Sequence, residues 1–322
     1  MVGKWIETQL DEIAAKSDRA FAMGPFGSNI KAENYRESGI PVIRGTNLGE
    51  CGESPFIPRG FVYLTEDKAD ELRSSTAIPN DIVFVAQGTV GKVGIVPTDT
   101  PYRRFILSQN LMKVTVNPER ADARFVFYYY RSYLGQHEIM SRVNPTGVPC
   151  ISKPLTSLRQ FHIRMPSDIH EQRAIAHILG ALDDKIELNR NRNQTLEGIA
   201  QALFKSWFVD FDPVRAMAEN RNTGLPKHIA DLFPDLFENS EIGEIPKGWD
   251  VTPLSELINL TKGVSYSSSE LVESDTALVT LKSFARGGGY RPEGLKSFAG
   301  SYKANQVVVP GDVVVALSLI HI

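Results

Sequence analysis

Apolar residues recur every seven positions in one long stretch of the chain, between residues 168 and 208. The repeat has two interleaved series: Ile175, Leu182, Asn189, Leu196 and Leu203, and then Leu179, Ile186, Asn193, Ala200 and Trp207. A repeat sustained over this length is typical of a coiled-coil seam. It predicts one amphipathic helix, on the order of 50 Å long at about 1.5 Å per residue, which needs a partner to cover its apolar side.

Two polar residues, Asn189 and Asn193, interrupt this seam. An asparagine at a seam position costs stability but fixes register and partner orientation, because a mispaired side chain is buried without hydrogen bonds. Alternatively, the two residues mark a point where the seam frays. Apolar residues resume on both sides, which favours the first interpretation.

Residues 1–166 show a different pattern, in which short apolar runs are bounded by Gly, Pro and Asn. PVIR at 41–44 and DIVFV at 81–85 suit strands, and GTVGKVGIV at 88–96 suits a glycine-punctuated strand pair. An aromatic-rich segment at 124–140 has Phe125, Tyr128, Tyr129 and Tyr133 near helical spacing. We interpret it as core packing and not as a base-stacking platform, because large aromatic side chains mostly serve burial. The mixture indicates the α+β class.

The opening of this first domain returns after the long helix. WIETQLDEI at 5–13 is matched by WDVTPLSEL at 249–257, and IPNDIVF at 78–84 by VPGDVVV at 309–315. Strand-like runs at 277–281 and 307–315 therefore correspond to those near Val42 and Ile82. The chain divides into a mixed α/β domain (1–166), a spacer helix (167–210), a connector (211–244), an incomplete second copy of the domain (245–316) and a short tail (317–322).

Composition sets limits on the class of protein. No apolar run approaches the roughly 20 residues that span a bilayer, and no signal-peptide pattern begins the chain. The two cysteines, Cys51 and Cys150, are too few for a disulfide framework. We expect a cytoplasmic protein without a membrane partner.

Charge is unevenly distributed along the chain. The whole sequence has a net charge of −3, but residues 91–166 carry +7 while residues 1–90 carry −4 and the remainder −6. The basic segment is a candidate for contact with phosphate groups. The alternative, that its charges lie on scattered solvated faces, is equally compatible with the sequence.

Motifs of catalysis are missing. NPTG at 144–147 lacks the second proline and the aromatic residue of an adenine-methylation motif, and Gly88 to Lys92 lacks the spacing of a P-loop. The histidines have no zinc-binding spacing. Asp183 and Asp184, like Asp210 and Asp212, are paired acids, but they suit a solvated helix face and the start of the connector better than a metal site. We therefore assign no catalytic residue and no metal ligand.

Four segments resemble the specificity subunits of type I restriction–modification enzymes. They are LFKSWFVDFDPV at 203–214, HEQRAIA at 170–176, LDDKIELNR at 182–190 and EIPKGWD at 244–250. The resemblance extends to about residue 316. It implies a non-catalytic subunit with two target-recognition domains, each of which reads half of a split double-stranded DNA site through the major groove. Between them, two antiparallel helices act as a ruler and dock methyltransferase subunits.

The resemblance also implies where the cofactors bind. We expect S-adenosylmethionine, ATP and Mg²⁺ on the methyltransferase and restriction (translocase) subunits, and none on this chain. Base readout needs paired donors and acceptors on loops. Our candidates for DNA contact are Arg44, Thr46, Asn47, Lys92, Arg103, Arg104, Gln109, Asn110, Arg142, Asn144, Thr146 and Lys153, of which we expect about a third to touch DNA.

Two alternative functions remain open from the sequence. The chain could be the reader region of a single-chain restriction–modification enzyme, or a coiled-coil adaptor that binds no DNA. The residues at 317–322, LSLIHI, do not continue the repeat and are what CTG TCT CTT ATA CAC ATC encodes, which resembles a sequencing-library adapter. We expect a non-native tail, the alternative being a natural truncation. An unpaired seam would also leave apolar surface exposed, so we expect self-association through residues 175–207.

Overall fold

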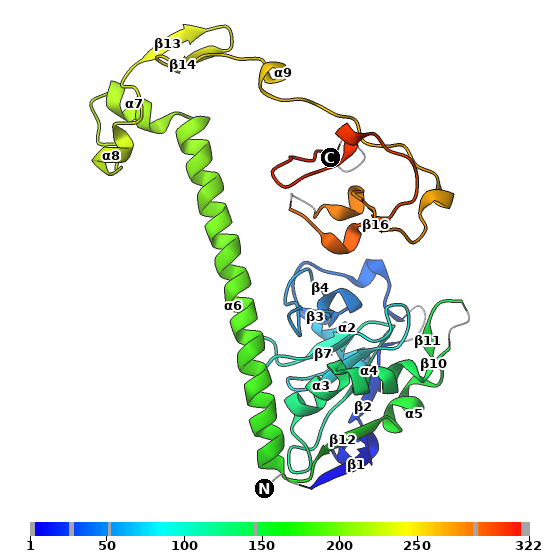
Figure 1. The fold of residues 1–322 in the computed structure, drawn as a ribbon. Coiled ribbons are helices and arrows are strands. Elements are labelled where there is room, and N and C mark those ends of the chain that lie inside the picture. Colours follow the sequence, from blue (N-terminus) through cyan, green and yellow to red (C-terminus); the bar gives the residue numbers. More distant parts are fainter. Residues whose placement is uncertain (1–3, 26–28, 51–52, 145–146, 286–288, 317–322) are drawn as a thin grey trace. The chain divides into compact units, whose positions relative to one another are not determined.

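The computed structural model describes residues 4–25, 29–50, 53–144, 147–285 and 289–316 (Figure 1). The chain folds as two compact units, Met1–Gln201 and Ala202–Ile322. Within the described ranges, no helix has the length and apolar character needed to cross a membrane. The mixed content of helix and sheet, together with one long helix, agrees with the α+β class expected from the sequence.

Two four-stranded sheets form the centre of the first unit. One sheet is antiparallel throughout and has the order β2 (Phe21–Met23), β9 (Leu111–Val114), β6 (Ile82–Val85) and β7 (Val93–Ile95). The other has the order β4 (Val62–Leu64), β3 (Ile40–Ile43), β8 (Phe105–Leu107) and β5 (Thr76–Ala77), in which only β3 and β8 run parallel. The strands that we expected near Val42 and Ile82 are therefore present as β3 and β6.

Shorter elements surround these sheets. The strands β1 (Trp5–Gln9) and β12 (His162–Pro166) pair antiparallel and bring the two ends of the domain together. A second small pair is β10 (Val143–Asn144) with β11 (Cys150–Ile151). The helices are α1 (Leu10–Ile13), α2 (Glu66–Glu71), α3 (Ala123–Arg131), α4 (Tyr133–Met140) and α5 (Pro154–Arg159), and the 3-10 turns are η2 (Ala32–Asn34), η3 (Gly45–Asn47) and η4 (Arg73–Ser75).

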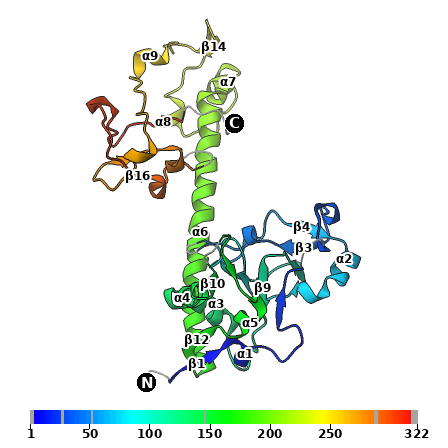
Figure 2. The same cartoon turned by 90° about the vertical axis from the view of Figure 1, so that its right-hand side faces the viewer.

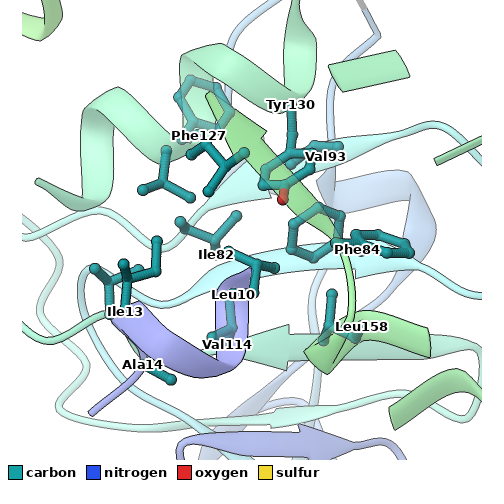
Figure 3. Close-up of a cluster of buried hydrophobic side chains, with 14 of the residues drawn as sticks. Leu10, Ile13, Ala14, Ile82, Phe84, Val93, Val114, Phe127, Tyr130 and Leu158 are labelled. Atoms are coloured by element: carbon teal, nitrogen blue, oxygen red, sulfur yellow. The ribbon is translucent and has the colours of Figure 1, made fainter. Parts of the chain in front are cut away.

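The strand β6 is buried on both faces, which explains its uninterrupted apolar sequence. Successive side chains of a strand point to opposite faces. Accordingly, Ile82 and Phe84 enter one hydrophobic cluster (Figure 3), while Val83 and Val85 enter another. In the first cluster the ring of Phe84 meets the ring of Tyr130 edge to face, at a centroid distance of 5.3 Å.

The aromatic segment is two helices and not one. Ser132 ends α3 and its hydroxyl accepts from the amide of Gly135 to begin α4. Phe125 is buried and Tyr128 and Tyr129 are half-buried, as expected for core packing, but the side chain of Tyr133 is 83% exposed. The core interpretation is wrong for Tyr133, because the helical phase changes at Ser132.

The predicted spacer helix is present as α6 (Ile169–Phe208), a single helix of 40 residues (Figure 2). Asp168 caps it by accepting from the amide of His170 at 2.9 Å. One narrow face of its first turns packs against the first unit, through the buried residues Gln172, Ala176 and Gly180. The Gln172 side chain accepts from Asp122 N and donates to Pro166 O, which fixes the helix to the domain.

The second unit contains shorter elements. They are α7 (Asp212–Ala218), α8 (Lys227–Ala230), the hairpin β13 (Phe237–Ser240) and β14 (Gly243–Pro246), α9 (Leu254–Leu257), the paired β15 (Ala277–Leu278) and β16 (Lys296–Ser297), and the 3-10 turns η5 (Ser268–Glu270), η6 (Leu281–Ser283), η7 (Pro292–Gly294) and η8 (Ala304–Gln306). An aromatic cluster follows α6, in which Phe208 lies against Phe233 and Trp249. Phe211 packs edge to face on Trp249.

The order of turns in the second unit repeats that of the first. The turns η5, η6 and η8 correspond to η2, η3 and η4, and the pair β15–β16 corresponds to β3–β4. The strand expected at 277–281 is confirmed only for Ala277–Leu278, whereas no strand forms at 307–315 and that prediction is wrong. In the first unit β3 pairs with β8, and β6 lies between β7 and β9. Among the described residues of the second unit, no strand takes the place of β6, β7, β8 or β9, and Val313 is 89% exposed.

Candidate nucleic-acid interface

Two loops meet where β3 and β8 end. Because these strands run parallel, their carboxyl ends lie at the same edge of the sheet. The loop that begins at Arg44 therefore lies beside Ser108–Asn110, and the amide of Ser108 donates to Ile43 O at 2.9 Å. Thr46 is exposed in the first loop, and Gln109 and Asn110 are exposed in the second.

A third and a fourth loop join them at the end of β6. The amide of Ala86 donates to Asn110 O at 2.7 Å, so the segment 86–90 lies against the second loop. The β10–β11 connection follows, since Gly88 N donates to Pro149 O and Ile151 N donates to Ala86 O, both at 2.9 Å.

Gly24 brings a fifth segment into the same place. Its amide donates to Leu111 O at 2.8 Å, and a Cβ atom here would lie 1.8 Å from Ser108 O. Only glycine permits so close an approach of two backbones. We call the assembled surface the loop cluster, which comprises residues 24–25, 44–46, 86–90, 108–110, 144 and 147–153.

Six of the candidate residues belong to the loop cluster: Arg44, Thr46, Gln109, Asn110, Asn144 and Lys153. Lys153 has a left-handed backbone with φ of 47°, which is uncommon for a residue other than glycine and is found preferentially at functional sites. Arg44 donates through Nη2 to Gly60 O, while its buried Nε has no hydrogen-bond partner among the described residues. Sequence reasoning missed Gln87 and Thr89, which are exposed in the same cluster directly after the buried strand β6.

Asn47 is not available to a base edge, although we selected it from the sequence. Its side chain is fully buried. Its Oδ1 accepts from Arg44 N at 2.9 Å, and its Nδ2 donates to Ile57 O and Arg59 O, each at 3.0 Å. The residue holds the η3 turn in shape and presents no free donor or acceptor.

Four basic candidates lie outside the loop cluster. Lys92 pairs with Glu50 at 3.0 Å, and Arg142 pairs with Glu138 at 3.0 Å. Arg104 is bound by Glu66 and Asp70, and Arg103, like Arg104, precedes β8 at the strand end opposite the cluster. The remaining candidate, Thr146, lies outside the described residues.

Much of the basic excess in residues 91–166 is neutralised inside the domain. Besides Lys92, Arg104 and Arg142, Arg159 pairs with Asp11 at 2.6 Å and the buried Lys113 pairs with Asp81 at 3.0 Å. Several of the acidic partners belong to residues 1–90. The charge count of the segment therefore overstates the positive potential of its surface.

The seam of α6 lies beside the face that packs on the domain. Successive residues of an α-helix are rotated by about 100° around its axis. The seam residues therefore point in a different direction from Gln172, Ala176 and Gly180. Ile175 and Trp207 are partly buried. The others are exposed: Leu179 (36%), Leu182 (54%), Ile186 (44%), Leu196 (53%) and Leu203 (44%), together with Asn189, Asn193 and Ala200.

A shallow apolar cleft of about 570 Å³ continues the seam onto the first unit. It is lined by Trp5, Phe125, Tyr128, Ile175 and Leu179, among others. Tyr128 fixes α6 to α3 by donating from its hydroxyl to Asp183 Oδ2 at 2.9 Å. Burial, and then this hydrogen bond, raises the pKa of the Tyr128 hydroxyl above its ordinary value.

Three of the four paired acids, Asp183, Asp210 and Asp212, have structural partners. Asp183 accepts from Tyr128, Asp210 pairs with Lys205, and Asp212 accepts from the Ser206 hydroxyl at 2.7 Å. Across the ranges that the structure describes, no group of three or more His, Cys, Asp or Glu side chains is arranged to hold a metal ion.

A mixed α/β domain that gathers five loops at one edge and continues into a long amphipathic helix defines a binding module with a spacer. The chain belongs to the family described as the type I restriction modification DNA specificity domain, whose model matches residues 30–198.

Two curated relatives give the extent of the similarity. The specificity subunit of the type I restriction enzyme HindI of Haemophilus influenzae is 36% identical over 216 residues, which is 66% of this chain and 46% of the relative. The MjaIX specificity subunit of Methanocaldococcus jannaschii is 25% identical over 247 residues, or 76% of this chain and 50% of the relative. The chain thus spans about half the length of the curated relatives it matches.

Among solved structures, the type I restriction–modification S subunit from M. genitalium is similar with a TM-score of 0.42 and 16% identity. The similarity covers 85% of this chain and 59% of that one.

Proposed function

We propose that the chain is the DNA-reading part of a type I restriction–modification specificity subunit, in which the first unit binds one half of a bipartite double-stranded site. The observation that carries this proposal is the loop cluster. Five segments far apart in the sequence place Thr46, Gln87, Gln109, Asn110 and Asn144 on one surface. Their amides and hydroxyls are the groups that recognise base edges.

The spacer helix has a separate role in this proposal. The exposed seam of α6 pairs with a second helix and sets the distance between two half-sites, and the helical pair docks methyltransferase subunits. Family membership and the exposed apolar seam support this role, because a stripe of this length has to be covered in water.

The chain is proposed to be a non-catalytic component. It supplies the site, while the methyltransferase and restriction subunits supply the chemistry with S-adenosylmethionine, ATP and Mg²⁺. The structural partners of Asp183, Asp210 and Asp212 support this division of roles.

The test is an electrophoretic mobility shift of duplex DNA by the full chain, alone and with the cognate methyltransferase subunit, over a series of salt concentrations. Gln109→Ala with Asn110→Ala removes base-reading groups from the loop cluster and is expected to weaken discrimination between sequences. The matched control is Gln194→Ala with Asn191→Ala, at exposed positions of α6. Salt-insensitive or undetectable binding under both conditions would refute the proposal and leave an adaptor without DNA binding.

A further inference from the structure

A cleft of about 590 Å³ opens beside the loop cluster in the first unit. One wall is β2 with the residues just before it, and the other is formed by α2 and η4. Gly24 and Pro25, which belong to the loop cluster, line one part of the cleft, so the two surfaces are continuous. Arg19, Lys68 and Arg73 bring three basic side chains to it.

Two of these cations differ from most basic residues of the domain. Arg19 and Arg73 are exposed, and neither makes a hydrogen bond or an ion pair with any residue that the structure describes. In contrast, Lys92, Arg104, Arg142 and Arg159 are all bound to carboxylates. Glu71 is paired with Lys68 at 2.6 Å, and Asp18 also lines the cleft, so three basic side chains face two acidic ones and the lining keeps a net positive charge.

Both guanidinium groups line the same cleft, and an anion bound there would complement their charge. Guanidinium groups bind phosphate oxygens through paired N–H donors. The amide of Asn29 and the hydroxyl of Ser74, which also line the cleft, add uncharged donors. The chemistry of the cleft therefore suits a phosphodiester.

The turn at this cleft, η4, is repeated in the second unit as η8. There η8 corresponds to η4, because Ala304 precedes Asp312 by the interval that separates Arg73 from Asp81. Lys303 caps η8, and the side chain of Gln306 donates to Lys262 O at 3.0 Å. The turn is therefore repeated, whereas its arginine is replaced by Ala304 in the second unit.

We propose that this cleft holds backbone phosphates of the DNA whose bases face the loop cluster, with Arg19 and Arg73 as the phosphate-binding residues. The inference rests on the proposed function, since it names the groups that position the duplex. Such contacts contribute affinity without sequence preference.

The experiment measures how the affinity of the full chain for a mixed-sequence duplex depends on salt, in the wild type and in Arg19→Gln/Arg73→Gln. Each phosphate contact contributes about 0.9 to the slope of log affinity against log salt. The double variant should therefore reduce the magnitude of the slope by about 1.8, with discrimination between sequences unchanged. The charge-conserving variant Arg19→Lys/Arg73→Lys should restore most of the slope, and a thermal unfolding scan verifies that each variant is folded.

The matched control is Arg173→Gln/Arg192→Gln, which removes the same charge from exposed positions of α6. An unchanged slope in Arg19→Gln/Arg73→Gln, or an equal reduction in the control, would overturn the inference while leaving the proposed function intact. A wild-type chain without salt-sensitive binding would overturn both.

Discussion

Replacing Asp81 by asparagine removes the counter-charge of a buried ammonium group while changing the volume of the side chain very little. Asp81 is 0% exposed and Lys113 3%, and Lys113 Nζ lies 3.0 Å from Asp81 Oδ2. The pair connects the turn before β6 to β9. The loop at 86–90 follows β6, and the loop at 108–110 precedes β9. Asparagine still offers an acceptor to the amide of Ile78, which now donates to Asp81 at 2.8 Å.

Desolvation outweighs attraction in this pair. Burial raises the pKa of the Asp81 carboxyl although the Lys113 charge opposes the shift, and burial lowers the pKa of the Lys113 ammonium although Asp81 opposes it. Breaking a buried pair from one side costs about 3–5 kcal/mol, because the remaining charge is left uncompensated. We expect Asp81→Asn to fall in that range.

Removing both charges should cost much less than the sum of the single changes. Asp81→Asn/Lys113→Met leaves no isolated charge and loses mainly hydrogen bonds, at about 1–2 kcal/mol in total. Lys113→Met alone should cost about 1–3 kcal/mol, less than Asp81→Asn. The Asp81 carboxylate keeps two donors, Ile78 N and the Thr115 hydroxyl at 2.5 Å, and can take up a proton.

The measurement has to be local, because the chain folds as two units and a single unfolding curve mixes them. Hydrogen exchange of the β6 and β9 amides in a urea series reports the free energy of opening for this region. A double variant as unstable as the two single variants added together would refute the reasoning, since it would show no coupling between the two charges.

Three further predictions concern the site and the helix. Asn47→Ala should lower the free energy of unfolding of the first unit by about 1–3 kcal/mol, because it removes the hydrogen bonds that hold the η3 turn; an unchanged stability in urea unfolding followed by hydrogen exchange would contradict this structural role. The pKa of the Tyr128 hydroxyl is raised in the folded state above the value of 10.0 that it has in the unfolded chain. Its contribution to the free energy of unfolding is therefore complete below pH 10.0 and is lost as the pH rises above that value. Tyr128→Phe should flatten this alkaline decline in melting temperature, and an unchanged decline would contradict the assignment. In a background of Cys51→Ser and Cys150→Ser, copies with Leu182→Cys should form disulfides with copies carrying Ala200→Cys on non-reducing gels, whereas disulfides of Leu182→Cys with itself would contradict an antiparallel seam.

The period of apolar residues was sufficient to predict the long helix and the strands near Val42 and Ile82. The sequence patterns of these elements follow from their local geometry. In β6, for example, alternate side chains are buried in two different clusters, so every residue of the strand is apolar. The runs at 277–281 and 307–315 carry the same local pattern without forming comparable strands. A strand needs hydrogen-bonding neighbours, and the pattern of one segment does not supply them.

Individual site residues were harder to predict, because one side-chain type serves two purposes. Asn47 and Asn110 both have amide side chains in loops, the first shortly after β3 and the second directly before β9. One satisfies backbone groups inside a turn while the other is exposed, and only the fold separates them. The same holds for cations, since Arg104 and Arg19 differ in the carboxylates that the fold brings near them.

The residue sizes along the seam determine which orientation of a paired α6 packs well. In a parallel pair, Ala200 would face Ala200 and Trp207 would face Trp207, leaving one layer underfilled and another crowded. In the antiparallel register that places Asn189 opposite Asn193, Ala200 faces Leu182 and Trp207 faces Ile175. A larger residue then opposes a smaller one in each of these two layers, which fills both more evenly, and the asparagines can satisfy each other's hydrogen bonds. Both orientations pair the two polar residues, so it is the volumes of Ala200 and Trp207 that favour the antiparallel arrangement.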